Sequence, residues 1–315
     1  MRETIKQTDN RITVGIPESM LYFRYETLWK TFFSVLDINC ITSGPTTKEI
    51  LSEGIVLSVD EACLITKIFL GHVNSLIGKC DYILVPRISN FGLKRNMCTK
   101  FESLYDLTAN IFRDSGQKFI SYNIDVIKKI DEESAFLTMG EELGLPKRAV
   151  MHAYKAAKKA EAEHLKAELA AQEAKFKQPG LKILICAHSY VENDAYIGRP
   201  VTKYLEKNGV VPVFADIVDR LSAIKISAKV SPTIKWEFSR EIMGSIQMNA
   251  DRIDGIILLS AFPCGPDSMV DDMINRKFRG IPMLNIVLDD QDGTAGLETR
   301  LESFIDILRF KGGTL

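Results

Sequence analysis

Three cysteines stand where a parallel α/β sheet would place a ligand, and thiolates are the side chains that bind soft metal centres. The most telling is Cys264, which follows the apolar run Ile256–Leu259. A continuous apolar run predicts a strand buried on both faces. The turn Pro263–Pro266 then leads into a helix that Asp267 is suited to cap. Ligands of open α/β sheets bind at this end of a strand, so Cys264 is either a ligand-binding thiol or a half-buried structural one.

Cys98 and Cys63 have similar surroundings in the first half of the chain. Cys98 lies between the predicted strand Asp81–Arg87 and a helix that begins near Lys100. Cys63 precedes an amphipathic helix that we place over residues 64–77. The positive end of a helix dipole favours the thiolate at such a position.

Three thiolates from two halves of a chain suit a soft metal centre at an interface. They would fill three corners of a [4Fe–4S] cluster and leave one iron open to substrate, water or another ligand. Zinc fits the same count of thiolates, and the spacing alone leaves both metals open. The six cysteines contain no C-x-x-C pair, so any metal site must draw its ligands from distant loops.

The remaining cysteines and histidines are weaker candidates. Cys40 lies inside a short predicted strand and Cys80 at the end of a helix, so we expect both to be structural. Cys186 ends an apolar strand, and His188 follows it in a loop; both are possible additional ligands. The four histidines do not cluster in the sequence.

Strands alternate with helices in both halves of the sequence, which predicts parallel sheets. We expect an α/β fold of two doubly wound, Rossmann- or flavodoxin-like domains joined by a long helix. The predicted parts are residues 10–145 with Cys63 and Cys98, a charged linking helix over 146–180, and residues 181–315 with Cys264. The linking helix is rich in Ala, Lys and Glu and lacks a leucine seam, so it should lie against both domains.

Composition excludes several functional classes. Hydrophobic residues make up 46% and charged residues 26% of the 315, which is typical of a globular protein. A formal net charge of −1 gives no reason to expect nucleic-acid or membrane-surface binding. With no signal peptide or membrane span visible, we expect a cytoplasmic protein with free thiols. Neither a G-x-G-x-x-G nor a G-x-x-x-x-G-K-[ST] motif occurs, so we do not expect this chain to hydrolyse ATP.

Six segments together resemble the activase-related branch of the superfamily of 2-hydroxyacyl-CoA dehydratases, benzoyl-CoA reductases and double-cubane cluster proteins. They are VGIPESMLYFRYETLWKTFF, VDEACLITKIFLGHV, DYILVPRI, MCTKF, SAFPCGPDSMV and LDDQDGTAGLETRLESF, in this order. The resemblance implies a two-domain α/β protein with an iron–sulfur cluster between the domains, and Cys63, Cys98 and Cys264 match the family's ligands. It also implies a separate ATP-hydrolysing activator, itself with a [4Fe–4S] cluster, that delivers low-potential electrons.

What the relatives do with these electrons differs, and so do some motifs. The resemblance implies either dehydration of an acyl-CoA or reduction of a small molecule, in an anaerobic, oxygen-sensitive protein that pairs as a homodimer. Thr99 stands where the family often has proline, and Asp290 with Gln291 where a Glu-His pair is common. A double-cubane [8Fe–9S] cluster would need more than three thiolates, so we favour one [4Fe–4S] cluster. The alternatives are a non-catalytic iron–sulfur electron carrier or redox sensor, and a zinc-binding or metal-free interaction protein.

Overall fold

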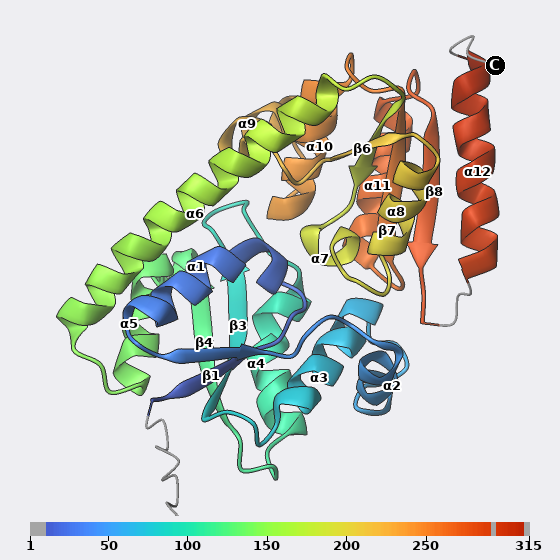
Figure 1. The fold of residues 1–315 in the computed structure, drawn as a ribbon. Helices are drawn as coiled ribbons and strands as arrows, with labels where there is room; N and C mark the ends of the chain where they lie inside the picture. Colours follow the sequence, from blue (N-terminus) through green and yellow to red (C-terminus); the bar gives the residue numbers. More distant parts are fainter. Residues whose placement is uncertain (1–10, 291–293, 312–315) are drawn as a thin grey trace, which may run out of the picture.

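The computed structural model describes residues 11–290 and 294–311, and their strands form two four-stranded sheets (Figure 1). All pairings are parallel. The first sheet has the order β2-β1-β3-β4, with β1 (Thr13–Ile16), β2 (Asn39–Thr42), β3 (Tyr82–Asn90) and β4 (Lys118–Asp125). The second has the order β6-β5-β7-β8, with β5 (Lys182–Cys186), β6 (Val211–Phe214), β7 (Gly255–Ala261) and β8 (Met283–Leu288). The predicted α/β fold is confirmed.

Helices connect successive strands, as right-handed parallel crossovers require. Those of the first half are α1 (Tyr22–Val35), α2 (Lys48–Val56), α3 (Leu64–Leu76), α4 (Thr99–Ile111) and α5 (Glu132–Glu142). Those of the second half are α7 (Ser189–Glu192), α8 (Arg199–Lys207), α9 (Arg220–Val230), α10 (Glu237–Asn249), α11 (Gly265–Lys277) and α12 (Thr294–Lys311). No helix in the described parts of the chain has the length and apolar character needed to cross a bilayer.

The central strands are buried because helices cover both faces of each sheet. Every residue of β7 is buried, as its unbroken apolar run predicts. A single hydrophobic cluster extends through both halves, from Val14 in β1 to Ile257 in β7 and Leu308 in α12. The two halves therefore share a continuous apolar core.

The long helix α6 (Lys147–Phe176) connects the two halves and packs against both, as predicted (Figure 1). At its beginning it contacts α1 and α5, and further along it reaches β6. Gln172 fixes this end: its Nε2 donates to the carbonyls of Phe214 and Ile217 at 2.8 and 2.7 Å, and its Oε1 accepts from the Phe214 amide. The contact with both halves limits how α6 can move relative to either sheet.

Helices α2 and α3 approach each other more closely than side chains would allow. A Cβ on Gly71 would lie 1.9 Å from the carbonyl oxygen of Ile50, and one on Gly54 would lie 1.8 Å from that of Lys67. Only glycine permits such backbone contact. The crossing fixes α3, and with it the position of Cys63 at its start.

Several local predictions need correction. Strand β3 continues to Asn90, three residues beyond the predicted end, because Asn90 pairs with Asp125 of β4. Cys80 lies in the turn after α3, which already ends at Leu76. The helices α5, α7 and α9 were not anticipated, since none shows a strong apolar stripe in the sequence.

Candidate functional site

Each of the three candidate cysteines occupies the N-cap position of a 13-residue helix. Cys63 is the N-cap of α3, Cys98 of α4 and Cys264 of α11. All three have extended backbone, and none uses its side chain to cap its helix. Cys63 Sγ lies 3.1 Å from Thr66 Oγ1 in the first turn of its helix, and three positive helix ends surround the three sulfurs.

Backbone hydrogen bonds between the two halves bring these helix starts together. The amide of Leu64 donates to the carbonyl of Phe262 at 2.8 Å, which ties the start of α3 to the turn that carries Cys264. The segment before Cys98 is tied in a similar way. The Asn96 amide donates to Lys235, and the Glu237 amide donates to Asn96, each at 2.9 Å.

The sheet topology explains why the cysteines gather here. In each sheet the strand order reverses next to the first strand, between β1 and β3 and between β5 and β7. Such a reversal opens a crevice at the carboxyl ends of the strands, where ligands of α/β proteins bind. Cys98 follows β3, and Cys264 follows β7. The two crevices face each other, so one site serves both sheets.

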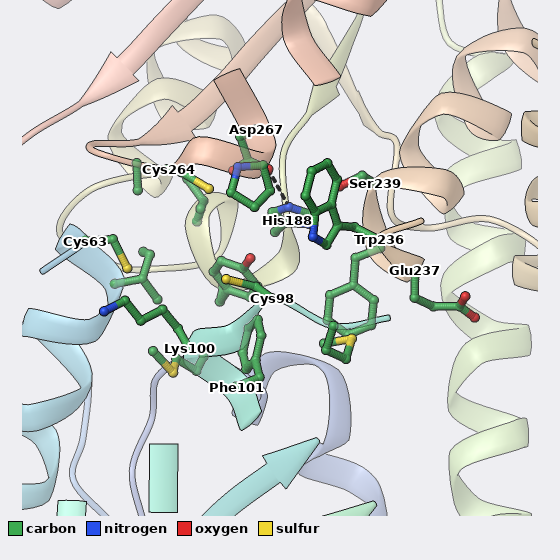
Figure 2. A pocket seen from close by; sticks show the side chains of 18 of the residues that line it. Cys63, Cys98, Lys100, Phe101, His188, Trp236, Glu237, Ser239, Cys264 and Asp267 are labelled. Carbon is green, nitrogen blue, oxygen red and sulfur yellow. Dashed lines mark hydrogen bonds and ion pairs between the residues drawn. The ribbon is translucent and has the colours of Figure 1, made fainter. Parts of the chain in front are cut away.

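One pocket contains all three cysteines, and Figure 2 shows their side chains around a shared space. Counting its open mouth, the empty space amounts to about 610 Å³. Its other walls are mostly apolar and come from both halves: Met20, Ile65, Met97, Phe101, Tyr190, Val191, Trp236, Phe238, Ala261 and Pro266. Aromatic contacts seal the back, where Phe101 packs edge-on against Tyr190 and Phe238. The site is thus a small, largely apolar chamber with sulfur at its entrance.

His188 and Asp267 are the ionisable pair in this chamber (Figure 2). His188 Nε2 lies 2.9 Å from Asp267 Oδ1, and its ring stacks on Tyr190 at 5.0 Å between centroids. Burial opposes the charged imidazole, but the Asp267 carboxylate outweighs it and raises the pKa of His188. Burial likewise opposes the carboxylate, but His188 outweighs it and lowers the pKa of Asp267. Each member of the pair therefore favours the charged form of the other.

The thiols of Cys98 and Cys264 are held in the protonated form. Burial raises the pKa of both, and the carboxylate of Asp267 raises that of Cys264 further. The helix dipoles do not overcome this desolvation. A metal that binds here must therefore displace a proton from each of these two thiols.

The spacing of the possible ligands bears on which metal centre could bind here. In residues 11–290 and 294–311, no three His, Cys, Asp or Glu side chains come close enough to hold one metal ion. Zinc draws its thiolates to about 2.3 Å from a single point. A cubane instead binds each thiolate to a different iron, so its sulfurs stay further apart. The three cysteines around this pocket are each half-buried.

The other predicted residues divide into two groups. His188 lines the chamber, whereas Cys186 faces a separate small cavity behind it and is buried in the core of the second half. Cys40 is in β2 and Cys80 follows α3, both away from the chamber. Trp236 and Phe238 were missed, because they precede and begin α10 in a stretch whose sequence shows no clear periodicity. The one feature of the sequence that could have indicated them is that two aromatic residues lie close together in a polar region.

A family model described as "CoA enzyme activase uncharacterised domain (DUF2229)" matches residues 13–218. The matched segment includes Cys63 and Cys98 and ends before Cys264. The match confirms the activase-related part of the resemblance; which subgroup the chain falls into stays a prediction. None of the curated proteins matches the chain.

Some solved structures align with the chain at low similarity. The laminin-binding protein Lbp of Streptococcus pyogenes is 13% identical and aligns over 95% of this chain and 99% of its own, with a TM-score of 0.27. The laminin-binding adhesin Lmb of Streptococcus agalactiae is 14% identical over the same shares, with a TM-score of 0.28. A Zn(II)-bound AdcAII variant of Streptococcus pneumoniae is 12% identical over 94% of this chain and 97% of its own, with a TM-score of 0.28. Similarities this weak support no inference about function.

Proposed function

Because this chain belongs to the CoA enzyme activase uncharacterised domain family, we propose that it is an iron–sulfur redox protein. In this proposal Cys63, Cys98 and Cys264 hold one [4Fe–4S] cluster between the two sheets. A separate ATP-hydrolysing activator provides the electrons. The protein uses them to reduce a small molecule or to dehydrate an acyl-CoA.

The observation that carries the proposal is the meeting of three N-cap cysteines at one pocket on the crevices of both sheets. A cluster with thiolate ligands carries negative charge, and three helix N-termini stabilise an anion in such a position. Apolar walls keep water from the remainder of the chamber, which favours one-electron chemistry over side reactions. When bound, the cluster would supply low-potential electrons one at a time.

His188 can donate a proton to a ligand that receives an electron from the cluster. Its imidazole is buried, its pairing with Asp267 favours the protonated form, and it lines the same pocket as the cysteines. Since Asp267 and Tyr190 fix the ring, it can act as a general acid toward a ligand in the chamber without rearrangement.

The surface beside Cys264 suits a protein partner. Phe262 and Met269, which flank the cysteine turn, are 51% and 59% exposed. Contiguous exposed apolar surface marks protein interaction sites, and these two side chains are our basis for placing the activator here. An activator that docks here would bring its own cluster close to the proposed one.

Iron and acid-labile sulfide per chain, measured after anaerobic reconstitution, test the proposal, together with the EPR spectrum of the reduced protein. We expect about four of each in wild type and a loss of iron with an altered spectrum in Cys264→Ser. Cys40→Ser is the matched control, because Cys40 is a half-buried cysteine outside the pocket. A colourless wild type, or equal iron in the two variants, would refute the proposal. About eight iron per chain would instead indicate the double cubane.

A turnover assay of the loaded protein then distinguishes an enzyme from an electron carrier. The loaded protein, reduced through an activator and ATP, should consume a substrate if the chamber binds one at the open iron. His188→Gln should slow that turnover while leaving the iron content unchanged. A protein that passes electrons onward and consumes no small molecule would be a carrier.

A further inference from the structure

A second cavity, distinct from the cysteine pocket, lies on the other side of α7. It is enclosed by α1, α6, α7 and the carboxyl end of β6, with α9 at its edge. Counting its open mouth, as for the cysteine pocket, the empty space amounts to about 670 Å³. His164 and Glu168 of α6 form its mouth and are 54% and 39% exposed, whereas Glu192 on its floor is only 3% exposed. Nothing in the proposed redox function uses this cavity.

Buried polar atoms without partners are concentrated around it. In the described part of the chain, six buried side-chain nitrogen or oxygen atoms lack a hydrogen-bond partner. Four of them belong to residues that line this cavity: Arg24 Nε, Glu192 Oε2, Asp216 Oδ1 and Arg220 Nε. Because native proteins satisfy nearly all buried polar groups, such a concentration indicates that something else completes the site.

The two arginines of the cavity are in different situations. Arg24 donates from both terminal nitrogens to the carboxylate of Glu241, each at 2.8 Å, so its charge is balanced. Arg220 makes no hydrogen bond or ion pair with any residue in the described ranges. Burial and the nearby Arg24 both lower its pKa. Glu241 and Glu161 act in the opposite direction, but a half-buried guanidinium whose Nε has no hydrogen-bond partner can still accept an anionic ligand.

Acidic side chains also line the cavity, and Arg220 lies within electrostatic range of Asp216 and Glu168. Burial raises the pKa of Glu192 well above its ordinary value, and the adjacent carboxylate of Asp216 raises it further. Burial also raises the pKa of Asp216, so both carboxyl groups favour the protonated form more than exposed ones do. Glu168 lies within electrostatic range of both. The cavity thus has a positive pole at Arg220 and a negative pole at the carboxyl groups.

We propose that this cavity binds a small zwitterion of the class of short amino acids. Its carboxylate would pair with Arg220, and its ammonium group would donate to Asp216 and Glu168. A ligand with both charges leaves the net charge of the site unchanged, whereas a simple anion or cation would satisfy one pole and face repulsion from the other. Glycine is the smallest ligand of this class and serves as the probe.

Calorimetric titration of the full chain with glycine, acetate and methylammonium tests this proposal. Acetate and methylammonium each reproduce one end of glycine. We expect glycine to bind at least tenfold more tightly than either, and Arg220→Gln and Asp216→Asn each to weaken glycine at least tenfold. Lys229→Gln removes an exposed cation from the same helix α9 and should change nothing.

Arg220→Lys is the control for a loss of binding that results only from unfolding of the site. It keeps the charge but loses the planar fork, so glycine should still bind, more weakly than to wild type. No heat from glycine, equal affinity for acetate and glycine, or unchanged glycine binding in a folded Arg220→Gln would each overturn the proposal.

Discussion

Replacing His72 with glutamine should change how the stability of this protein responds to acid. His72 is completely buried between two hydroxyls, with Ser43 Oγ 2.7 Å from Nδ1 and Thr46 Oγ1 2.8 Å from Nε2. Thr46 donates its one hydroxyl proton to Asp194 Oδ2 at 2.5 Å, so it must accept from Nε2–H. Ser43 accepts the amide of Glu18 and is free to donate to Nδ1. This chain of bonds defines a neutral imidazole.

The magnitude follows from the pKa. Burial lowers the pKa of His72 from its ordinary value of 6.5 to about 4. Since each unit corresponds to 1.36 kcal/mol, this shift amounts to roughly 3 kcal/mol of unfolding free energy. The folded pKa lies below the unfolded one, so the unfolded chain takes up the proton first. The stability is complete above about pH 6.5 and is lost as the pH falls toward 4.

Urea denaturation at pH 7.5 and pH 4.5 measures this effect. Between them, wild type should lose about 2.5 kcal/mol more than His72→Gln. Asp194 has a pKa raised by burial, which acts in the opposite direction, but its contribution is common to both proteins. His164→Gln, at an exposed histidine, should retain the wild-type dependence. Parallel pH profiles for wild type and His72→Gln would refute the assignment of a neutral, buried His72.

Two further substitutions test the packing that holds the site. Gly71→Ala should destabilise by several kcal/mol or prevent folding, because its Cβ would collide with the backbone of α2, whereas Gly280→Ala has open space and should cost less than 1 kcal/mol in urea denaturation. Glu241→Ala leaves the buried Arg24 without a counter-charge and should cost about 3–5 kcal/mol. Glu173→Ala breaks an exposed ion pair and should cost at most about 1 kcal/mol in the same assay. Equal losses within either pair of variants would contradict the reasoning.

The sequence predicts the architecture and part of the site for a clear physical reason. Strands buried on both faces have unbroken apolar runs, and the loops that follow them converge at one edge of a parallel sheet. Residues such as Cys98 and Cys264 are therefore located by their place after a strand. The long helix α6 can also be predicted from the sequence, because its Ala, Lys and Glu composition favours a helix over a strand or a loop.

The site residues that the sequence does not predict are those whose position depends on which helices face each other. Trp236 enters the chamber only because its backbone pairs with Asn96 across the two halves. Arg220 and Glu192 belong to helices that show no apolar stripe, and they meet at the second cavity only after α6 has packed against both sheets. Such juxtapositions arise from tertiary packing, and no local pattern encodes them.

The backbone bonds that tie Leu64 to Phe262 and Asn96 to Glu237 determine when the cysteine chamber can exist during folding. They join segments that are far apart in the chain, and contacts of this kind form late because a large loop must close first. A growing polypeptide exposes Cys63 and Cys98 well before Cys264 has been synthesised. The chamber is therefore completed only when both halves have folded and docked, so a loaded metal centre would report that assembly of the whole molecule is finished.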